Sequence, residues 1–68
     1  MIRTEYHLYC KKPVDTVKMQ LSFLEKFEKS LVDVTPKGRH VIVNIYGHDK
    51  TSKKAVSEVA ELFECKVE

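Results

Sequence analysis

The spacing of the apolar residues changes along this chain, and the order of the changes limits the folds that it can adopt. Residues 2–10 alternate between two faces, and the more apolar face comprises Ile2, Tyr6, Leu8 and Cys10. This period of two is typical of a half-buried β-strand. Pro13 then interrupts the pattern because it lacks the N–H that a strand ladder needs, and Asp15 or a neighbour can cap a helix. We therefore expect a strand followed by a helix.

Residues 14–30 predict that helix, because apolar side chains recur there at three- and four-residue steps. The stripe comprises Val17, Leu21, Leu24 and Leu31, with Phe23 and Phe27 widening it on one flank. Such a stripe is typical of a helix that packs one face on a core. Met19 lies at the edge of the stripe, so we expect it at the margin of the core.

The next segment predicts a β-hairpin. Residues 31–36 alternate, Lys37 and Gly38 form a turn signal, and residues 39–46 are rich in β-branched side chains. Two such runs joined by a short turn are typical of paired antiparallel strands.

A second helix and a short tail complete the pattern. The helix would begin near Asp49 or Ser52, and its apolar face comprises Val56, Val59, Ala60 and Phe63. These positions stand at i, i+3, i+4 and i+7, which is one helical face. Residues 65–68 alternate once more and predict either an edge strand or a frayed end.

The resulting order of strand, helix, strand, strand, helix and strand is the ferredoxin-like βαββαβ arrangement. Right-handed crossovers would give a four-stranded antiparallel sheet in the order 4-1-3-2, with both helices on one face. A chain of 68 residues has room for one core, so we expect residues 1–68 to form a single α+β domain. Without the last strand, the alternative is a three-stranded βαββα domain.

The predicted topology leaves one face of the sheet free of helices. Its candidate partner-binding residues are His7, Tyr9, His40, Ile42, Asn44 and Tyr46. Tyr9 and Tyr46 should be exposed on this face, whereas Tyr6 should be buried beneath the helices. Aromatic and aliphatic side chains grouped in this way can anchor an interface, so we expect a non-enzymatic binding or regulatory module that docks a protein partner or a second copy of itself.

Nucleic-acid binding is the alternative function. Basic side chains should gather at one pole of the domain, and they comprise Lys11, Lys12, Lys37, Arg39 and Lys66. Such a cluster could bind phosphates while neighbouring rings stack on bases. Only the opening basic-glycine pair, Lys37-Gly38, matches the RNA-recognition signature, and Glu5, Asp33 and Glu68 would repel phosphates.

The two cysteines predict structure rather than metal chemistry. In length and element order the chain is similar to small heavy-metal-associated chaperones, whose first loop carries a Cys-x-x-Cys pair, but here that loop reads Cys10-Lys11-Lys12-Pro13. A soft metal wants two thiolates, and the second is missing. Cys10 and Cys65 should point inward as free, poorly reactive thiols, so we expect no metal and no cofactor.

Composition excludes several functional classes. The net charge of +2 does not by itself imply a polyanion partner. No nucleophile with a base, paired carboxylates or phosphate-binding glycine loop stands out, so we do not expect an enzyme. No apolar run reaches the ~20 residues of a membrane span. Two cysteines without a secretory leader favour a reducing cytoplasm.

Overall fold

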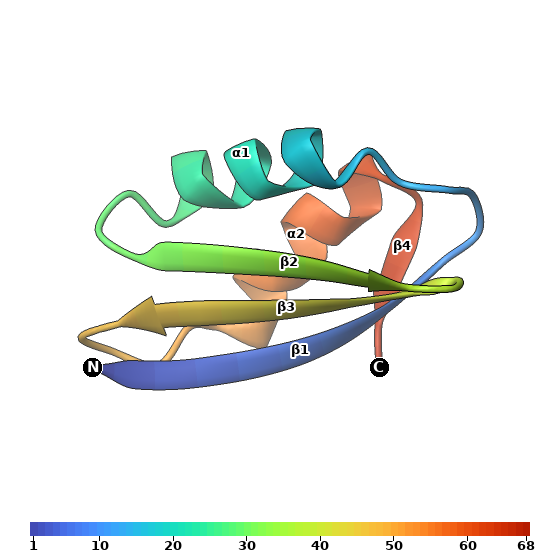
Figure 1. Ribbon diagram of the computed structural model, residues 1–68. Helices are drawn as coiled ribbons and strands as arrows, with labels where there is room; N and C mark the ends of the chain where they lie inside the picture. Colours follow the sequence, from blue (N-terminus) through green and yellow to red (C-terminus); the bar gives the residue numbers. More distant parts are fainter.

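The computed structural model describes all 68 residues and contains four strands and two helices (Figure 1). In chain order the elements are β1 (Ile2–Cys10), α1 (Thr16–Lys26), β2 (Leu31–Lys37), β3 (His40–Gly47), α2 (Lys53–Leu62) and β4 (Cys65–Val67). The sheet order is β2-β3-β1-β4, which is β4-β1-β3-β2 from the other edge. Every neighbouring pair is antiparallel.

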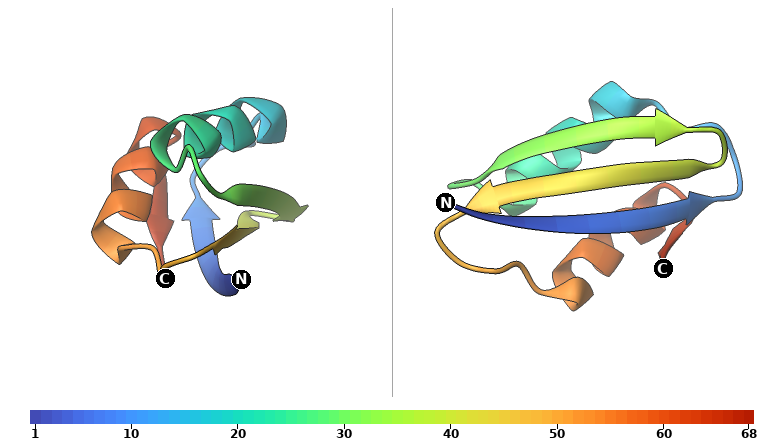
Figure 2. Two further views of the ribbon diagram at one scale, coloured as in Figure 1. Left: turned by 90° about the vertical axis from the view of Figure 1, so that its left-hand side faces the viewer. Right: turned by 60° about the horizontal axis from the view of Figure 1, so that its bottom comes forward.

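The molecule has two layers, because both helices lie on the same face of the sheet (Figures 1 and 2). The predicted α+β class with a four-stranded antiparallel sheet and two helices is confirmed. The three-stranded alternative is wrong, because Cys65–Val67 pairs with the end of β1. The core fills the space between the layers and comprises Leu8, Cys10, Met19, Phe23, Val32, Val41, Val43, Ile45, Val56, Val59, Ala60 and Cys65.

Helix α1 begins as predicted but buries a different face. The Asp15 carboxylate caps it by accepting hydrogen bonds from the backbone N–H groups of Val17 and Lys18. Val17 and Leu21, which were expected in the core, are 65% and 58% exposed, whereas Met19 and Phe23 are fully buried. The helix buries its bulkier side, on which the rings of Phe23 and Phe27 stack at 6.4 Å.

Three further details of the predicted packing are corrected. The helix ends at Lys26, so Leu31 is not part of its stripe; it begins β2, as the alternation of residues 31–36 predicted, and is 62% exposed. Ile2 is 40% exposed, because the first residues of β1 extend beyond the cover of the helices. Tyr6 points toward the helix layer but is only half-buried, and its hydroxyl donates to the Thr51 carbonyl at 2.8 Å. A tyrosine hydroxyl needs such a partner when its ring is covered.

Helix α2 follows its predicted pattern closely. Ser52 caps its first turn, and Val56, Val59 and Ala60 are buried. An ion pair between Lys26 and Glu58, 2.8 Å long, joins the two helices at the surface. Neither helix combines the length and the apolar character that crossing a membrane would require.

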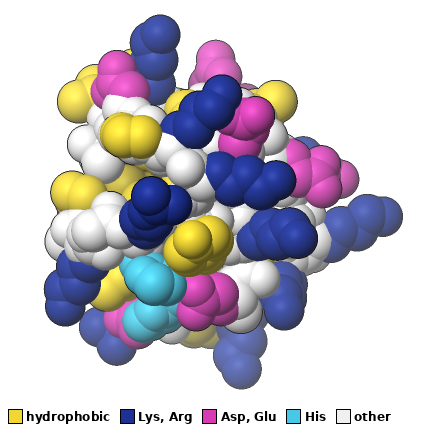
Figure 3. All heavy atoms as spheres, turned by 90° about the vertical axis from the view of Figure 1, so that its right-hand side faces the viewer, with side chains coloured by type: hydrophobic (Ala, Val, Ile, Leu, Met, Phe, Trp, Pro, Cys, Tyr) yellow, Lys and Arg dark blue, Asp and Glu magenta, His cyan; other side chains and the backbone are white.

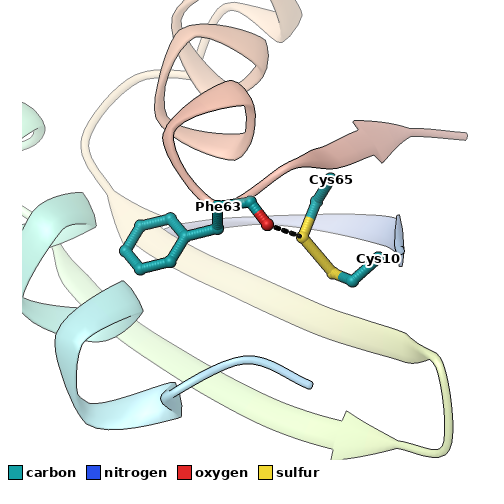
Figure 4. The surroundings of a disulfide bond; sticks show 3 residues. All are labelled: Cys10, Phe63 and Cys65. Carbon is teal, nitrogen blue, oxygen red and sulfur yellow. Dashed lines mark hydrogen bonds between the residues drawn. A yellow bond between two sulfur atoms is a disulfide. The ribbon is translucent and has the colours of Figure 1, made fainter. Parts of the chain in front are cut away.

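The cysteines form a disulfide, so the prediction of free thiols is wrong. Cys10 and Cys65 point inward as expected, but they are also direct partners in the β1–β4 ladder, with their Cα atoms 4.1 Å apart. Figure 4 shows the bond just after the carboxyl end of α2, where Cys65 Sγ lies 3.4 Å from the Phe63 carbonyl oxygen. A cytoplasmic location stays a prediction, but it loses the support that it drew from reduced cysteines.

Candidate functional site

Figure 2 (right) shows the helix-free face of the sheet, and strand register and burial place the six candidate partner-binding residues on it. Along β3 the inward residues Val41, Val43 and Ile45 are buried, so the alternate residues turn outward. Register pairs His7 with Ile42 and Tyr9 with His40. The face therefore joins His7, Tyr9, His40, Ile42, Asn44 and Tyr46 on two neighbouring central strands.

The apolar part of this face is wider than the sequence analysis suggested. Strand β2 places Leu31 opposite Tyr46 and Thr35 opposite Ile42. Leu31 is 62% exposed there, and Tyr9 is 39% exposed on β1. The sequence analysis counted Leu31 in the helical stripe as well as in the alternating residues 31–36, and it did not place Leu31 on this face. The alternation opposite to buried Val32 is the signal that places it here.

Both histidines on the face are held by carboxylates. His7 Nε2 lies 2.8 Å from Glu5 Oε2, and His40 Nε2 lies 2.9 Å from Glu68 Oε1. The His40 ring also meets the edge of Tyr9, with centroids 5.4 Å apart. These contacts limit the rotamers of both histidines, which favours binding because less conformational freedom is lost when a partner docks.

One polar atom on this face lacks a partner. Asn44 Oδ1 is buried and accepts no hydrogen bond, and the residues beside Asn44 on the neighbouring strands are Glu5 and Asp33. Carboxylates are acceptors and cannot satisfy it. A buried acceptor without a donor costs about 1–3 kcal/mol.

The hydrogen bond to His7 lowers the pKa of the Glu5 carboxyl below its ordinary value of 4.5, and desolvation, the second-largest effect, opposes it. Charges on His7, Arg3 and Lys37 lower it further. A carboxyl whose pKa is lower in the folded than in the unfolded protein stabilises the fold at pH values above the unfolded-state pKa. That contribution is lost as the pH falls through the folded-state pKa. The replacement His7→Ala should therefore raise the pKa of Glu5 toward 4.5, as measured by NMR titration of its carboxylate.

His48→Ala is the matched control for this titration, because His48 is an exposed histidine in the loop after β3. It should leave the pKa of Glu5 unchanged. Equal values for Glu5 in the wild type and in His7→Ala would show that the contact between His7 and Glu5 is not formed in solution.

The candidate basic residues lie at the end of the domain that carries the β2–β3 turn. Lys and Arg side chains are spread over this end, with acidic side chains between them (Figure 3). A cleft of about 280 Å³ is lined there by Lys11, Lys12 and Arg39, together with Cys10, Pro13, Val14, Pro36, Gly38 and Val41. The other two basic residues lie on strands, Lys37 opposite His40 and Lys66 opposite Tyr9.

Charge pairing at this end is incomplete. Lys12 binds Glu64 at 3.0 Å, but none of the remaining four forms an ion pair. These cations could attract a phosphate or a carboxylate. The arrangement as a whole offers apolar contact and hydrogen bonding on the sheet face, and positive charge at one end of it.

We compared the chain with protein-family models, with curated proteins and with solved structures, and none of them matches it.

Proposed function

We propose that this chain is a small, non-enzymatic binding or regulatory module that docks a protein partner on its helix-free sheet face. The observation that carries the proposal is apolar surface on that face, with Leu31 opposite Tyr46 on one side of Asn44 and Ile42 on the other, which no helix covers. Aromatic and aliphatic side chains at the centre of a patch supply most of the binding energy of protein interfaces.

The surroundings of this surface support the same function. Polar side chains lie beside these apolar residues, with Arg3 next to Tyr46 and His7 next to Ile42. The row of Asp33, Asn44 and Glu5 lies between Ile42 and the Tyr46–Leu31 pair, so a partner would meet apolar and polar side chains in turn.

The strand order and the antiparallel pairing also support a ferredoxin-like assignment for the fold. In this arrangement each helix connects two strands that are separated by a third. One sheet face therefore remains available for binding.

Nucleic acid is the second candidate ligand, and the unpaired cations Lys11 and Arg39 in the basic cleft favour it. Phosphate binding depends on counterion release, whereas docking on the sheet face depends mainly on apolar burial. Mutants that remove charge or apolar surface should therefore separate the two functions.

The test uses the immobilised chain to capture protein from a nuclease-treated extract and, separately, to bind a labelled single-stranded RNA. The double replacement Ile42→Ala and Tyr46→Ala should reduce capture of any specific protein at least about thirtyfold, the effect of losing one strong interface anchor. Changing Lys11, Lys12 and Arg39 to Gln should alter that capture little.

A matched control changes Val17 and Leu62 to Ala, because these side chains are 65% and 76% exposed on the helices, away from the sheet face. This control should bind like the wild type. If instead the basic triple mutant loses binding, the Ile42/Tyr46 mutant keeps it, and RNA affinity falls steeply with salt, the nucleic-acid function replaces the proposed one.

A further inference from the structure

The first half of β1 has a neighbouring strand on one side only. Strand β3 pairs with β1 from Ile2 to Tyr9, whereas β4 pairs only with Leu8–Cys10. The last hydrogen bond between this end of the chain and β1 runs from the Glu68 N–H to the His7 carbonyl, at 2.8 Å. Figure 2 (right) shows β4 beside the carboxyl end of β1 and not beside its amino end. Residues 2–6 therefore form an open sheet edge.

The backbone groups that face this edge follow from the alternation of a strand. The His7 carbonyl points toward β4, whereas the Cys10 N–H points the other way and binds the Arg39 carbonyl at 2.9 Å. Arg3 and Glu5 share the direction of His7, so their N–H and C=O groups face the open edge. No strand or loop of the chain supplies hydrogen-bond partners for them. Such an unpaired edge can pair with another strand.

In one register, the side chains along this edge are complementary to those of the same edge in a second copy of the chain. If an identical strand pairs antiparallel about Thr4, Arg3 stands opposite the second copy's Glu5, and Glu5 stands opposite its Arg3. Ile2 and Tyr6 pair in the same way on the helix side. Opposite charges and aromatic–aliphatic pairs stabilise cross-strand contacts. Arg3 forms no ion pair within its own chain, so it is available.

The backbone fits this register as well. It places Arg3 and the second copy's Glu5 as a hydrogen-bonded pair, so all four unpaired groups on each chain find partners. The incoming strand would extend from opposite Tyr6 to opposite Ile2. Glu68, after the end of β4, lies just beyond it opposite His7, so the second copy's Met1 must turn away from the sheet. The loop after β3 lies on the helix side, where Thr51 binds the Tyr6 hydroxyl, and makes no backbone hydrogen bond to the edge.

We propose that two copies of this chain pair through their β1 edges, antiparallel and centred on Thr4. The twofold axis of such a pair is perpendicular to the sheet. Both helix-free faces then point to the same side and form one continuous surface. This goes beyond the proposed function, because a dimer would present the docking face twice and bind a repeated or symmetric partner with avidity.

The first test introduces a cysteine at the centre of the proposed pairing. Thr4 would face the second copy's Thr4 as a non-hydrogen-bonded pair, about 4.5 Å apart at Cα, which a disulfide can bridge. Under mild oxidation Thr4→Cys should form a covalent dimer at least ten times faster than Arg3→Cys, whose copies would lie diagonally, roughly 7–8 Å apart. Peptide mapping of the Thr4→Cys dimer should show that the two introduced thiols are joined to each other. Equal rates for the two variants would overturn the proposal.

The second test reverses the charges and measures association by sedimentation equilibrium. Arg3→Glu and Glu5→Arg should each weaken dimerisation at least tenfold, and the two changes together should restore it. Singles that associate like the wild type, or a double that stays dissociated, would overturn the proposal. Ile42→Ala with Tyr46→Ala should leave the dimer intact. The two proposals can therefore fail separately. Charge-reversal variants that do not affect the dimer contradict pairing through β1, whereas an Ile42/Tyr46 variant that still captures protein contradicts docking on the sheet face.

Discussion

Reducing the Cys10–Cys65 disulfide is expected to lower the free energy of unfolding by about 4 kcal/mol, the entropy of closing a loop with a sequence separation of 55. A domain of 68 residues has a total stability of roughly 3–10 kcal/mol, so the loss removes a large part of it. The bond also joins β4, a strand of only 3 residues, to β1. Urea unfolding followed by circular dichroism, with and without reductant, measures the difference.

The control for this prediction is the double replacement Cys10→Ala and Cys65→Ala. It should unfold at low urea, and its midpoint should not respond to reductant. Both sulfurs belong to buried residues, so reduction of the wild type should proceed only as fast as the end of the domain opens. Identical midpoints in both conditions, or free thiols in the chain unfolded without reductant, would contradict the disulfide.

The disulfide shows how far the sequence could go. Alternation along residues 2–10 and 65–68 was enough to place both cysteines inward near the same end of neighbouring strands. Their pairing depends on register, because a slip by one residue would turn one of them to the other face. Three paired residues set that register in the structure, and the alternation of so short a tail did not define it.

The sheet face was predictable for a similar reason. Strands β1 and β3 are long, and the apolar residues that alternate along each of them define the inward and outward sets. The sequence therefore placed His7, Tyr9, Ile42 and Tyr46 together. The hydrogen bonds of the histidines, the exposure of Leu31 and the open edge at residues 2–6 depend on tertiary contacts and on the short length of β4. The periodicity of a sequence cannot predict such tertiary features.

Helix α1 presents the opposite case, because two apolar stripes compete in its sequence. Val17 and Leu21 share one side, and Met19 and Phe23 share another, about 200° away at 100° per residue. Counting apolar positions cannot choose between them. The structure buries the stripe with more surface, and the stacked ring of Phe27 extends it beyond the helix. The free energy of packing therefore decides which face points inward.

Replacing Phe23 with Ala should lower the free energy of unfolding by about 3–5 kcal/mol, because a fully buried ring is removed and leaves a cavity beside Met19 and Phe27. Leu21→Ala is the matched control on the same helix. Its side chain is 58% exposed, so we expect a loss below about 1 kcal/mol. Urea unfolding of the oxidised proteins gives both values. If Leu21→Ala were the more damaging change, α1 would bury the Val17–Leu21 side in solution, and the sequence periodicity would have been the better guide to its orientation.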